Sequence, residues 1–258
     1  MQVNLHTHTF RCRHATGTPE EYILRAVENG IKVLGFSEHA PFLFPNGFQS
    51  TYRLRVEEAK EYFAELNALR EKYKDKLTIY IGFEMEYYPL YFADMLKTAK
   101  ELGAEYLILG QHAIYNEYPN GKYTTGQYQT TAEDLTEYVD CIVAGIKSGV
   151  YTYVCHPDNI ATICDEEYYT AEMTRLCETA KQYDIPLEIN FYGIRDHRRY
   201  PDERFWKIAG RVGNRVVYGF DSHDTPAAFD GESIAVADEL VRKYGLELVE
   251  NPKIVKLD

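Results

Sequence analysis

The sequence predicts an α/β fold in which helices cover a parallel sheet that is either closed into a barrel or open and doubly wound. Short β-branched or apolar runs alternate with longer amphipathic segments along the whole chain. The strand-like runs are apolar on both faces, and neither an internal repeat nor a low-complexity linker interrupts the alternation. Because 258 residues can bury one large core, we expect one domain over residues 1–258.

Seven runs have the length and composition of strands, and each is followed by a loop and a segment with a helical pattern. They are residues 3–6, 32–37, 77–84, 106–111, 151–156, 186–190 and 215–221.

Helix starts are recognisable between these strands. Thr18 offers an N-cap, followed by proline at the first helical position and by Glu21, which can reach back to the cap. Thr131 and Thr170 repeat this logic. In residues 53–73, apolar side chains recur every three or four positions, as in a helix packed on a sheet.

Two loops are longer than the usual connections of such a fold. Residues 40–52 and 113–130 are rich in aromatic residues and contain glycine. Long loops after strands commonly build binding pockets, so we expect both loops to lie near a functional site.

Composition excludes several classes of protein. No run approaches the roughly 18 apolar residues that a membrane span needs, and the polar N-terminus does not resemble a signal peptide, so we expect a cytoplasmic protein without a membrane partner. Five cysteines without a CxxC pair indicate reduced thiols. A net charge of -12 disfavours nucleic acid as a partner. The 23 tyrosines are expected to line a pocket or the surface of a homo-oligomer.

The positions of the histidines predict the function. Seven of the eight follow a predicted strand, and two carboxylates, Glu84 and Asp221, end strands in the same way. Each residue alone has an ordinary structural explanation, as a buried, loop or capping residue. In a parallel barrel, however, the C-terminal strand ends meet at one rim, so these side chains would converge into a metal centre. The histidines are His6, His8, His14, His39, His112, His156 and His223; His197 is expected to be a loop residue.

The motifs HTH, SEH, GFE, GQH, CHP and DSH resemble those of the polymerase and histidinol phosphatase (PHP) superfamily over the whole chain. The resemblance implies a distorted (β/α)7 barrel, similar to a TIM barrel, with three divalent metal ions at the C-terminal ends of the strands. By this analogy one ion binds His6, His8, Glu84 and Asp221, a second binds Glu84, His112 and His156, and a third binds His14, His39 and His223. The ligand chemistry suits zinc, iron or manganese.

Residues 190–195 (NFYGIR) resemble a segment of histidinol-phosphate phosphatases in which an arginine holds the substrate phosphate. This likeness implies that Arg195 is the phosphate clamp and Asn190 a neighbouring contact. Arg11, Arg13 and Arg198 are candidates to assist it, and we expect all but one of these three to be ordinary surface charges. The predicted catalytic residues are Glu84, Asp221 and His223. Two carboxylates and two aromatic residues on loops at the predicted rim are candidates to recognise the cationic groups of histidinol phosphate: Glu86, Glu117, Tyr87 and Tyr115.

The resulting hypothesis is metal-assisted hydrolysis of a phosphomonoester, with histidinol phosphate as the first choice of substrate. Coordination lowers the pKa of water from about 15.7 to about 7, which makes hydroxide available at neutral pH. Two alternatives remain: a related phosphoesterase acting on phosphotyrosine proteins or nucleotides, and a metal-stabilised module without catalytic activity.

Overall fold

A computed structural model describes residues 1–119, 121–124 and 130–257. The main sheet of this described part has eight strands in the order β1-β2-β3-β4-β7-β8-β9-β10, and every neighbouring pair is parallel. They are β1 (Val3–Asn4), β2 (Val33–His39), β3 (Thr78–Glu84), β4 (Leu107–Leu109), β7 (Tyr151–Val154), β8 (Leu187–Asn190), β9 (Arg215–Gly219) and β10 (Glu247–Leu248).

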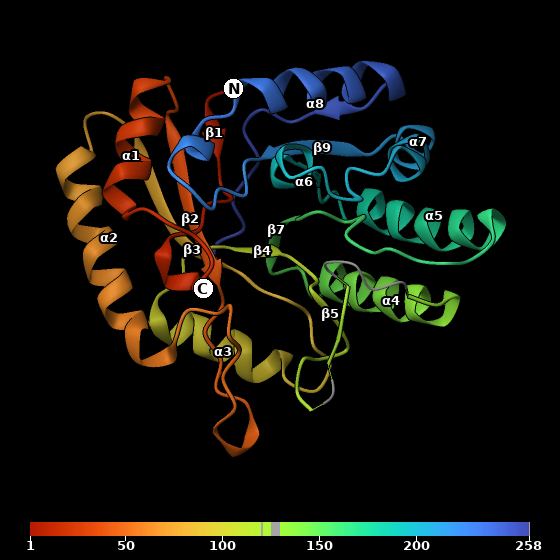
Figure 1. Cartoon of the computed structure of the whole chain (residues 1–258), viewed down its shortest axis with the longest axis horizontal. Coiled ribbons are helices and arrows are strands. Elements are labelled where there is room, and N and C mark those ends of the chain that lie inside the picture. The colour runs from red at the N-terminus through yellow and green to blue at the C-terminus, as the bar shows by residue number, and fades with distance from the viewer. Residues whose placement is uncertain (120, 125–129, 258) are drawn as a thin grey trace.

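The helices lie around the outside of the curled sheet (Figure 1). They are α1 (Pro19–Glu28), α2 (Ala59–Tyr73), α3 (Phe92–Leu102), α4 (Ala132–Ser148), α5 (Glu166–Gln182), α6 (Phe191–Arg195), α7 (Glu203–Val212) and α8 (Gly231–Tyr244). Short 3-10 helices are η1 (Phe10–Cys12), η2 (Pro45–Gly47), η3 (Val56–Glu58) and η4 (Pro226–Ala228). None of the helices in the described residues is long and apolar enough to cross a bilayer.

The sheet curls until its first and seventh predicted strands meet, which makes the distorted barrel. Thr7, just after β1, forms a parallel bridge with Ser222, just after β9. The backbone N–H of His8 donates to the Ser222 carbonyl at 3.0 Å, and that of Ser222 donates to the His6 carbonyl at 3.4 Å. All seven predicted strands are confirmed. The eighth strand, β10, was not predicted; it pairs with the opposite end of β9, where Glu247 faces Arg215.

Side chains alternate between the two faces of the strands, as the period of two requires. In β4, Leu107 and Leu109 pack under the surrounding helices, whereas Ile108 and the preceding Tyr106 point into the barrel. The barrel interior is filled by Val3, Leu5, Tyr106, Ile108, Tyr153, Cys155 and Val217. This packing fills the barrel below the C-terminal rim.

Two of the three predicted helix caps are confirmed. Thr18 and Thr131 each form a capping box, with Glu21 and Asp134 respectively. The expected cap at Thr170 is wrong. The N-cap is Asp165, five residues earlier, whose side chain accepts a hydrogen bond from the backbone N–H of Tyr168, and α5 begins at Glu166.

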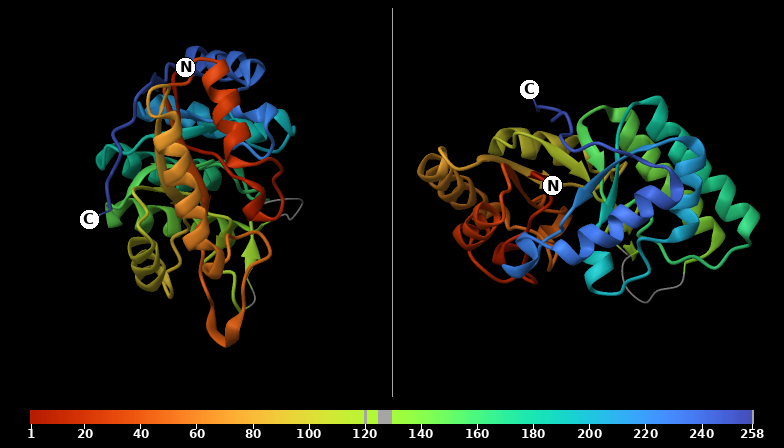
Figure 2. Two further views of the ribbon diagram at one scale, coloured as in Figure 1. Left: turned by 90° about the vertical axis from the view of Figure 1, so that its left-hand side faces the viewer. Right: turned by 90° about the horizontal axis from the view of Figure 1, so that it is seen from above.

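The two long loops lie at the same end of the barrel. Residues 40–52, the orange segment at the bottom of Figure 1, extend away from the sheet, and the left view of Figure 2 shows the same projection from the side. The second loop contains a small hairpin of β5 (Ala113–Ile114) and β6 (Lys122–Tyr123); its residues 120 and 125–129 lie outside the described part. Phe48 stacks on Tyr118 with ring centroids 5.0 Å apart, which joins the two loops.

Candidate metal centre

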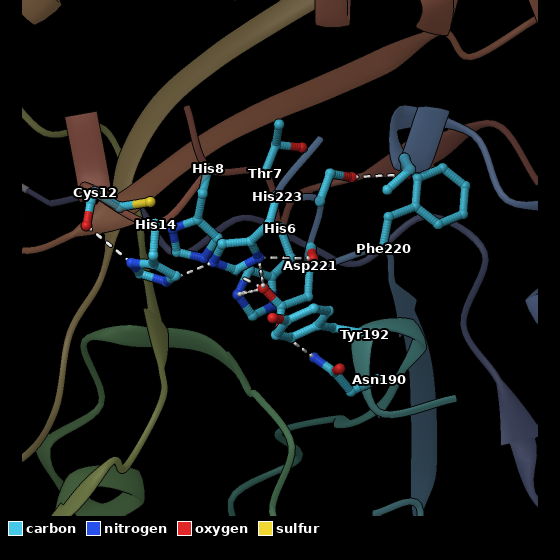
Figure 3. A network of polar contacts seen from close by, with 12 residues as sticks. His6, Thr7, His8, Cys12, His14, Asn190, Tyr192, Phe220, Asp221 and His223 are labelled. Atoms are coloured by element: carbon cyan, nitrogen blue, oxygen red, sulfur yellow. Dashed lines mark hydrogen bonds and ion pairs between the residues drawn. The ribbon is translucent and has the colours of Figure 1, made fainter. Parts of the chain in front are cut away.

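The rim of the barrel gathers the predicted imidazoles and carboxylates. Strands β2 and β3 end at His39 and Glu84, and the other predicted ligands follow the C-terminal ends of their strands within four residues, except His14, which lies beyond η1. Figure 3 shows His6, His8, His14, Asp221 and His223 turned toward one another from segments that are far apart in the sequence. The convergence predicted from strand positions is therefore present in the structure.

Glu84 lies at the centre of this cluster. Its Oε1 lies 2.9 Å from His156 Nε2 and 3.3 Å from His112 Nε2. Its Oε2 lies 3.0 Å from His39 Nδ1, 3.5 Å from His8 Nε2 and 3.6 Å from His6 Nε2. One carboxylate thus faces five imidazoles, two through one oxygen and three through the other.

This donor set fits a transition-metal ion. Two atoms bound at about 2.0–2.1 Å in tetrahedral geometry lie about 3.3–3.4 Å apart. Asp221 Oδ1 lies 3.5 Å from His6 Nε2 and 3.4 Å from His8 Nε2, close to that separation. These three atoms and Glu84 Oε2 are buried, and none has a hydrogen-bond partner among the described residues. Four buried nitrogen and oxygen atoms that face one another without hydrogen bonds would all be satisfied by a shared cation.

A glycine gives Glu84 the room to occupy this position. A Cβ atom at Gly110, just after β4, would lie 1.9 Å from Glu84 Oε1. Any larger residue there would displace the carboxylate, so the glycine in the GQH motif leaves the space that Glu84 occupies.

A second group of imidazoles lies beside the first. His14 Nδ1 donates to the Cys12 carbonyl at 2.8 Å, and His223 Nδ1 donates to the Asp221 carbonyl at 3.1 Å. Both Nε2 atoms therefore carry lone pairs, and they face each other at 2.9 Å. The His39 ring lies 5.5 Å from that of His14. Facing lone pairs repel unless a proton or a cation lies between them.

Carboxylates behind the imidazoles set which nitrogen carries the proton. Glu188 Oε1 accepts from His6 Nδ1 at 2.7 Å, and Glu86 Oε1 accepts from His112 Nδ1 at 2.8 Å. Glu38 lies 3.7 Å from His8 Nδ1. Such outer partners orient metal-binding histidines and raise their basicity. Sequence reasoning missed the roles of Glu38 and Glu188, although both stand within strands or at their ends.

The pKa values of the imidazoles show where the carboxylates of this cluster stabilise positive charge. Burial lowers the pKa of His8, but Asp221 and Glu38 raise it to about 9. Burial likewise lowers the pKa of His112, but Glu84 and Glu86 raise it to about 10. By contrast, burial and the neighbouring His223 lower the pKa of His14 to about 4. Binding of divalent ions would release the protons of His8 and His112, whereas His14 is neutral and available already.

Two of the predicted ligands have an unusual backbone. His156 and Asp221 adopt φ angles of 27° and 45° immediately after their strands. Such conformations cost about 1–3 kcal/mol for residues other than glycine and are concentrated at functional sites. Here they turn each side chain toward the rim.

A cavity of about 450 Å³ opens over the cluster. Metal-binding candidates form its floor, Tyr52, Tyr123, Tyr192 and Tyr200 contribute to its walls, and Arg13 and Arg198 bring positive charge. Arg198 donates to the Tyr192 hydroxyl at 2.9 Å, and the Tyr192 ring stacks on His223 with centroids 4.8 Å apart. Arg198 is therefore held at the edge of the cluster, whereas Arg13 is paired with Glu58.

The structure does not place every predicted substrate contact in the cavity. Arg195, the expected clamp, bonds Asp230 at 3.1 Å and the carbonyls of Phe220 and Asp221, and among the described residues it is not part of the cavity lining. Asn190 is buried and donates to Glu188 and Asp221, so it braces the cluster from behind.

The two glutamates expected to recognise the cationic groups of the substrate, Glu86 and Glu117, lie elsewhere. Both are buried against Arg53, and neither lines the cavity in the described chain.

Fold and site together define an α/β barrel with a cluster of metal-ligand side chains and an adjoining cavity at its C-terminal rim. Residues 4–191 match the model of the PHP domain family. The chain belongs to this family.

Known proteins resemble the chain over most or all of its length. It is 32% identical over 272 residues to a histidinol-phosphatase of Lactococcus lactis, covering 100% of this chain and 96% of that protein. It is 24% identical to a probable histidinol-phosphatase of Deinococcus radiodurans, covering 84% and 85%. A crystal structure of the histidinol phosphate phosphatase of Lactococcus lactis, in complex with zinc, L-histidinol and phosphate, superposes with a TM-score of 0.73 at 22% identity, covering 100% of this chain and 98% of that chain. This last likeness supports the fold.

Proposed function

We propose that this chain, as one PHP-type barrel domain, is a metal-dependent phosphomonoester hydrolase whose substrate is histidinol phosphate. The observation that carries the proposal is the convergence of nine ligand-type side chains on one rim, with four buried donor atoms unpartnered among the described residues. The similarity to the histidinol-phosphatase of Lactococcus lactis over the full chain supports the choice of substrate.

The residues divide into three sets, one for each of three divalent ions, and the first two sets share Glu84. His6, His8, Glu84 and Asp221 would hold one ion, and Glu84, His112 and His156 a second. His14, His39 and His223 would hold a third. Zinc, iron and manganese all suit this mixture of imidazoles and carboxylates. When bound, the ions supply Lewis-acid chemistry: they lower the pKa of water and offset the charge of phosphate oxygens.

The chain's own residues bind and orient the ester. Arg198 faces the cavity and is held by Tyr192 and Asp196, the latter at 2.8 Å from its Nε. We assign it the role of first phosphate contact in place of Arg195, with Arg13 on the other side of the cluster. A guanidinium pairs with two phosphate oxygens at once, which fixes the orientation of the phosphorus over Glu84 and Asp221.

Phosphate release tests the proposal directly. Metal-loaded protein is assayed with histidinol phosphate, phosphotyrosine peptide and nucleoside monophosphates, before and after chelation, with Zn²⁺, Mn²⁺ or Fe²⁺ restored. We expect the highest kcat/KM for histidinol phosphate, loss of activity on chelation and its return with metal. Faster turnover of another ester would refute the substrate, and full activity of metal-free protein would refute the mechanism.

A further inference from the structure

A buried arginine outside the cavity is attached to the metal cluster through one carboxylate. Arg53 precedes η3, and its side chain is only 2% exposed. Its Nη2 bonds Glu86 Oε2 at 2.6 Å, its Nε bonds Glu117 Oε1 at 2.5 Å, and its Nη1 donates to the Ala40 carbonyl at 3.0 Å. All three nitrogens of the guanidinium are therefore used.

These contacts tie three separate segments together. Ala40 begins the 40–52 loop, Glu86 follows β3, and Glu117 lies between β5 and β6 in the second long loop. A buried charge without partners costs several kcal/mol, so each segment is held where its acceptor meets the guanidinium. A lysine could not replace this fork, because one ammonium lacks the planar spread of donors.

Glu86 connects Arg53 to His112, a predicted metal ligand, by accepting a hydrogen bond from each. While Oε2 faces Arg53, Oε1 accepts from His112 Nδ1 at 2.8 Å and lies 3.3 Å from the Tyr52 hydroxyl. Because Glu86 holds a proton on Nδ1, the nitrogen of His112 that is left to bind an ion is Nε2, which lies 3.3 Å from Glu84 Oε1. Arg53 holds Glu86 with Oε2 turned toward the guanidinium, which leaves Oε1 facing His112 Nδ1.

The same guanidinium supports the wall of the cavity. The Arg53 carbon Cζ lies 5.1 Å from the centroid of the Tyr52 ring, and that ring lies edge-on to His39 at 5.0 Å. Tyr52 lines the cavity, whereas Arg53 is not among the lining residues of the described chain.

We infer that Arg53 is a positioning residue, which fixes the tautomer and direction of His112 through Glu86 and anchors the second long loop through Glu117. The inference rests on the proposed metal-dependent function. It adds a role for a residue that contacts neither the proposed ions nor the ester.

The test measures metal affinity in the full-length protein, separately from turnover. Metal-free Arg53→Met is titrated with Zn²⁺ or Mn²⁺ against a chromogenic chelator, and Arg55→Met is the control. Arg55 is exposed and two residues away, and its side chain hydrogen-bonds Gln49 at 3.1 Å. Loss of an outer partner typically weakens metal binding or activity by about 10–100-fold, and we expect this for Arg53→Met and less than about twofold for Arg55→Met. Affinity of Arg53→Met within twofold of wild type would overturn the inference.

A double-mutant cycle distinguishes positioning from general support of the fold. If Arg53 acts on His112 through Glu86, Arg53→Met/Glu86→Gln should bind metal about as weakly as the weaker single variant. Additive losses would mean independent effects and would contradict the inference. Where Arg53→Met does not fold, Arg53→Lys takes its place, with the same expectation of non-additivity.

Turnover of histidinol phosphate is measured on the same samples, with folding monitored by circular dichroism. If wild type binds metal but does not hydrolyse this ester, the proposed function fails. The metal affinities of the single and double variants still test the role of Arg53. If the wild type hydrolyses the ester and the cycle is additive, only the role of Arg53 fails.

Discussion

Glu188 provides the sharpest test of how the barrel prepares an imidazole for metal. This carboxylate is completely buried and accepts three hydrogen bonds: from His6 Nδ1 at 2.7 Å, from Asn190 Nδ2 at 2.8 Å and from the backbone N–H of His156 at 3.0 Å. It fits closely, since a Cβ at Gly219 would lie 1.7 Å from its Oε1. Glu188→Gln keeps the shape but replaces one acceptor oxygen by an NH₂ donor.

The consequence follows from counting donors. The amide keeps two of the three bonds if its oxygen faces His156 and Asn190, which turns its NH₂ toward His6 Nδ1. His6 must then accept at Nδ1 and carry its proton on Nε2, the atom that lies 3.5–3.6 Å from Asp221 Oδ1 and Glu84 Oε2. The Nε2 lone pair of His6 is then no longer available to bind an ion. We expect a 10–100-fold loss of metal affinity, or about 1.4–2.8 kcal/mol.

The measurement is a titration of metal-free protein against a chromogenic chelator, with Glu105→Gln as the control. Glu105 is also hydrogen-bonded, to Arg70 at 2.6 Å and to the N–H of Ile81 at 2.8 Å, but it precedes β4 at the other end of the barrel. The control should bind metal like wild type. If folded Glu188→Gln binds metal within twofold of wild type, the tautomer argument is refuted.

Three further predictions concern the cluster, the cavity and the pH dependence of stability. Glu84→Gln should retain the circular dichroism of wild type but lose more than about 100-fold in both metal affinity and kcat, because this carboxylate faces five imidazoles; full activity would contradict its central place. Arg198→Met should lower kcat/KM for histidinol phosphate by about 10–100-fold, the loss of one charged hydrogen bond, whereas Arg195→Met should have the smaller effect if Arg198 is the first phosphate contact. Burial raises the pKa of Asp158 to about 7, so its contribution to folding stability is present below the unfolded pKa of about 3.9 and is lost as the pH rises toward 7. In urea unfolding, the free energy of unfolding of Asp158→Asn should therefore rise relative to that of wild type by up to about 1.4 kcal/mol per pH unit between pH 5 and 7. If the two free energies depend on pH in the same way, the shift is refuted.

The strands and the histidines at their ends could be predicted from the sequence because both signals are local. Apolar runs mark β2, β3 and β9, and the residue that follows a parallel strand must lie at the rim. The rim positions of His39 and Asp221 could be predicted from these strand ends alone. The two-residue strand β10 carries no pattern of its own and exists through its pairing with β9, so it could not be found in this way.

The residues behind the ligands could not be predicted, because their importance arises from contacts distant in sequence. Glu188, inside the strand LEIN, has the appearance of an ordinary outward polar residue, but it meets His6 from the opposite end of the chain. Arg195 and Arg198 are equally basic in the sequence. Only the position of Asp230 in the fold shows that Arg195 has an acidic partner outside the cavity.

The bridge between Thr7 and Ser222 can form only after both ends of the barrel sequence have been synthesised. On the ribosome, His6 and His8 emerge roughly ten to forty seconds before His223 at typical rates of synthesis. Until the last strand docks, the early histidines form an incomplete chelate, with neither Asp221 nor the Glu188 acceptor in place. Ion capture must then follow translation, so the identity of the bound ion would reflect the pool that the finished, closed barrel encounters.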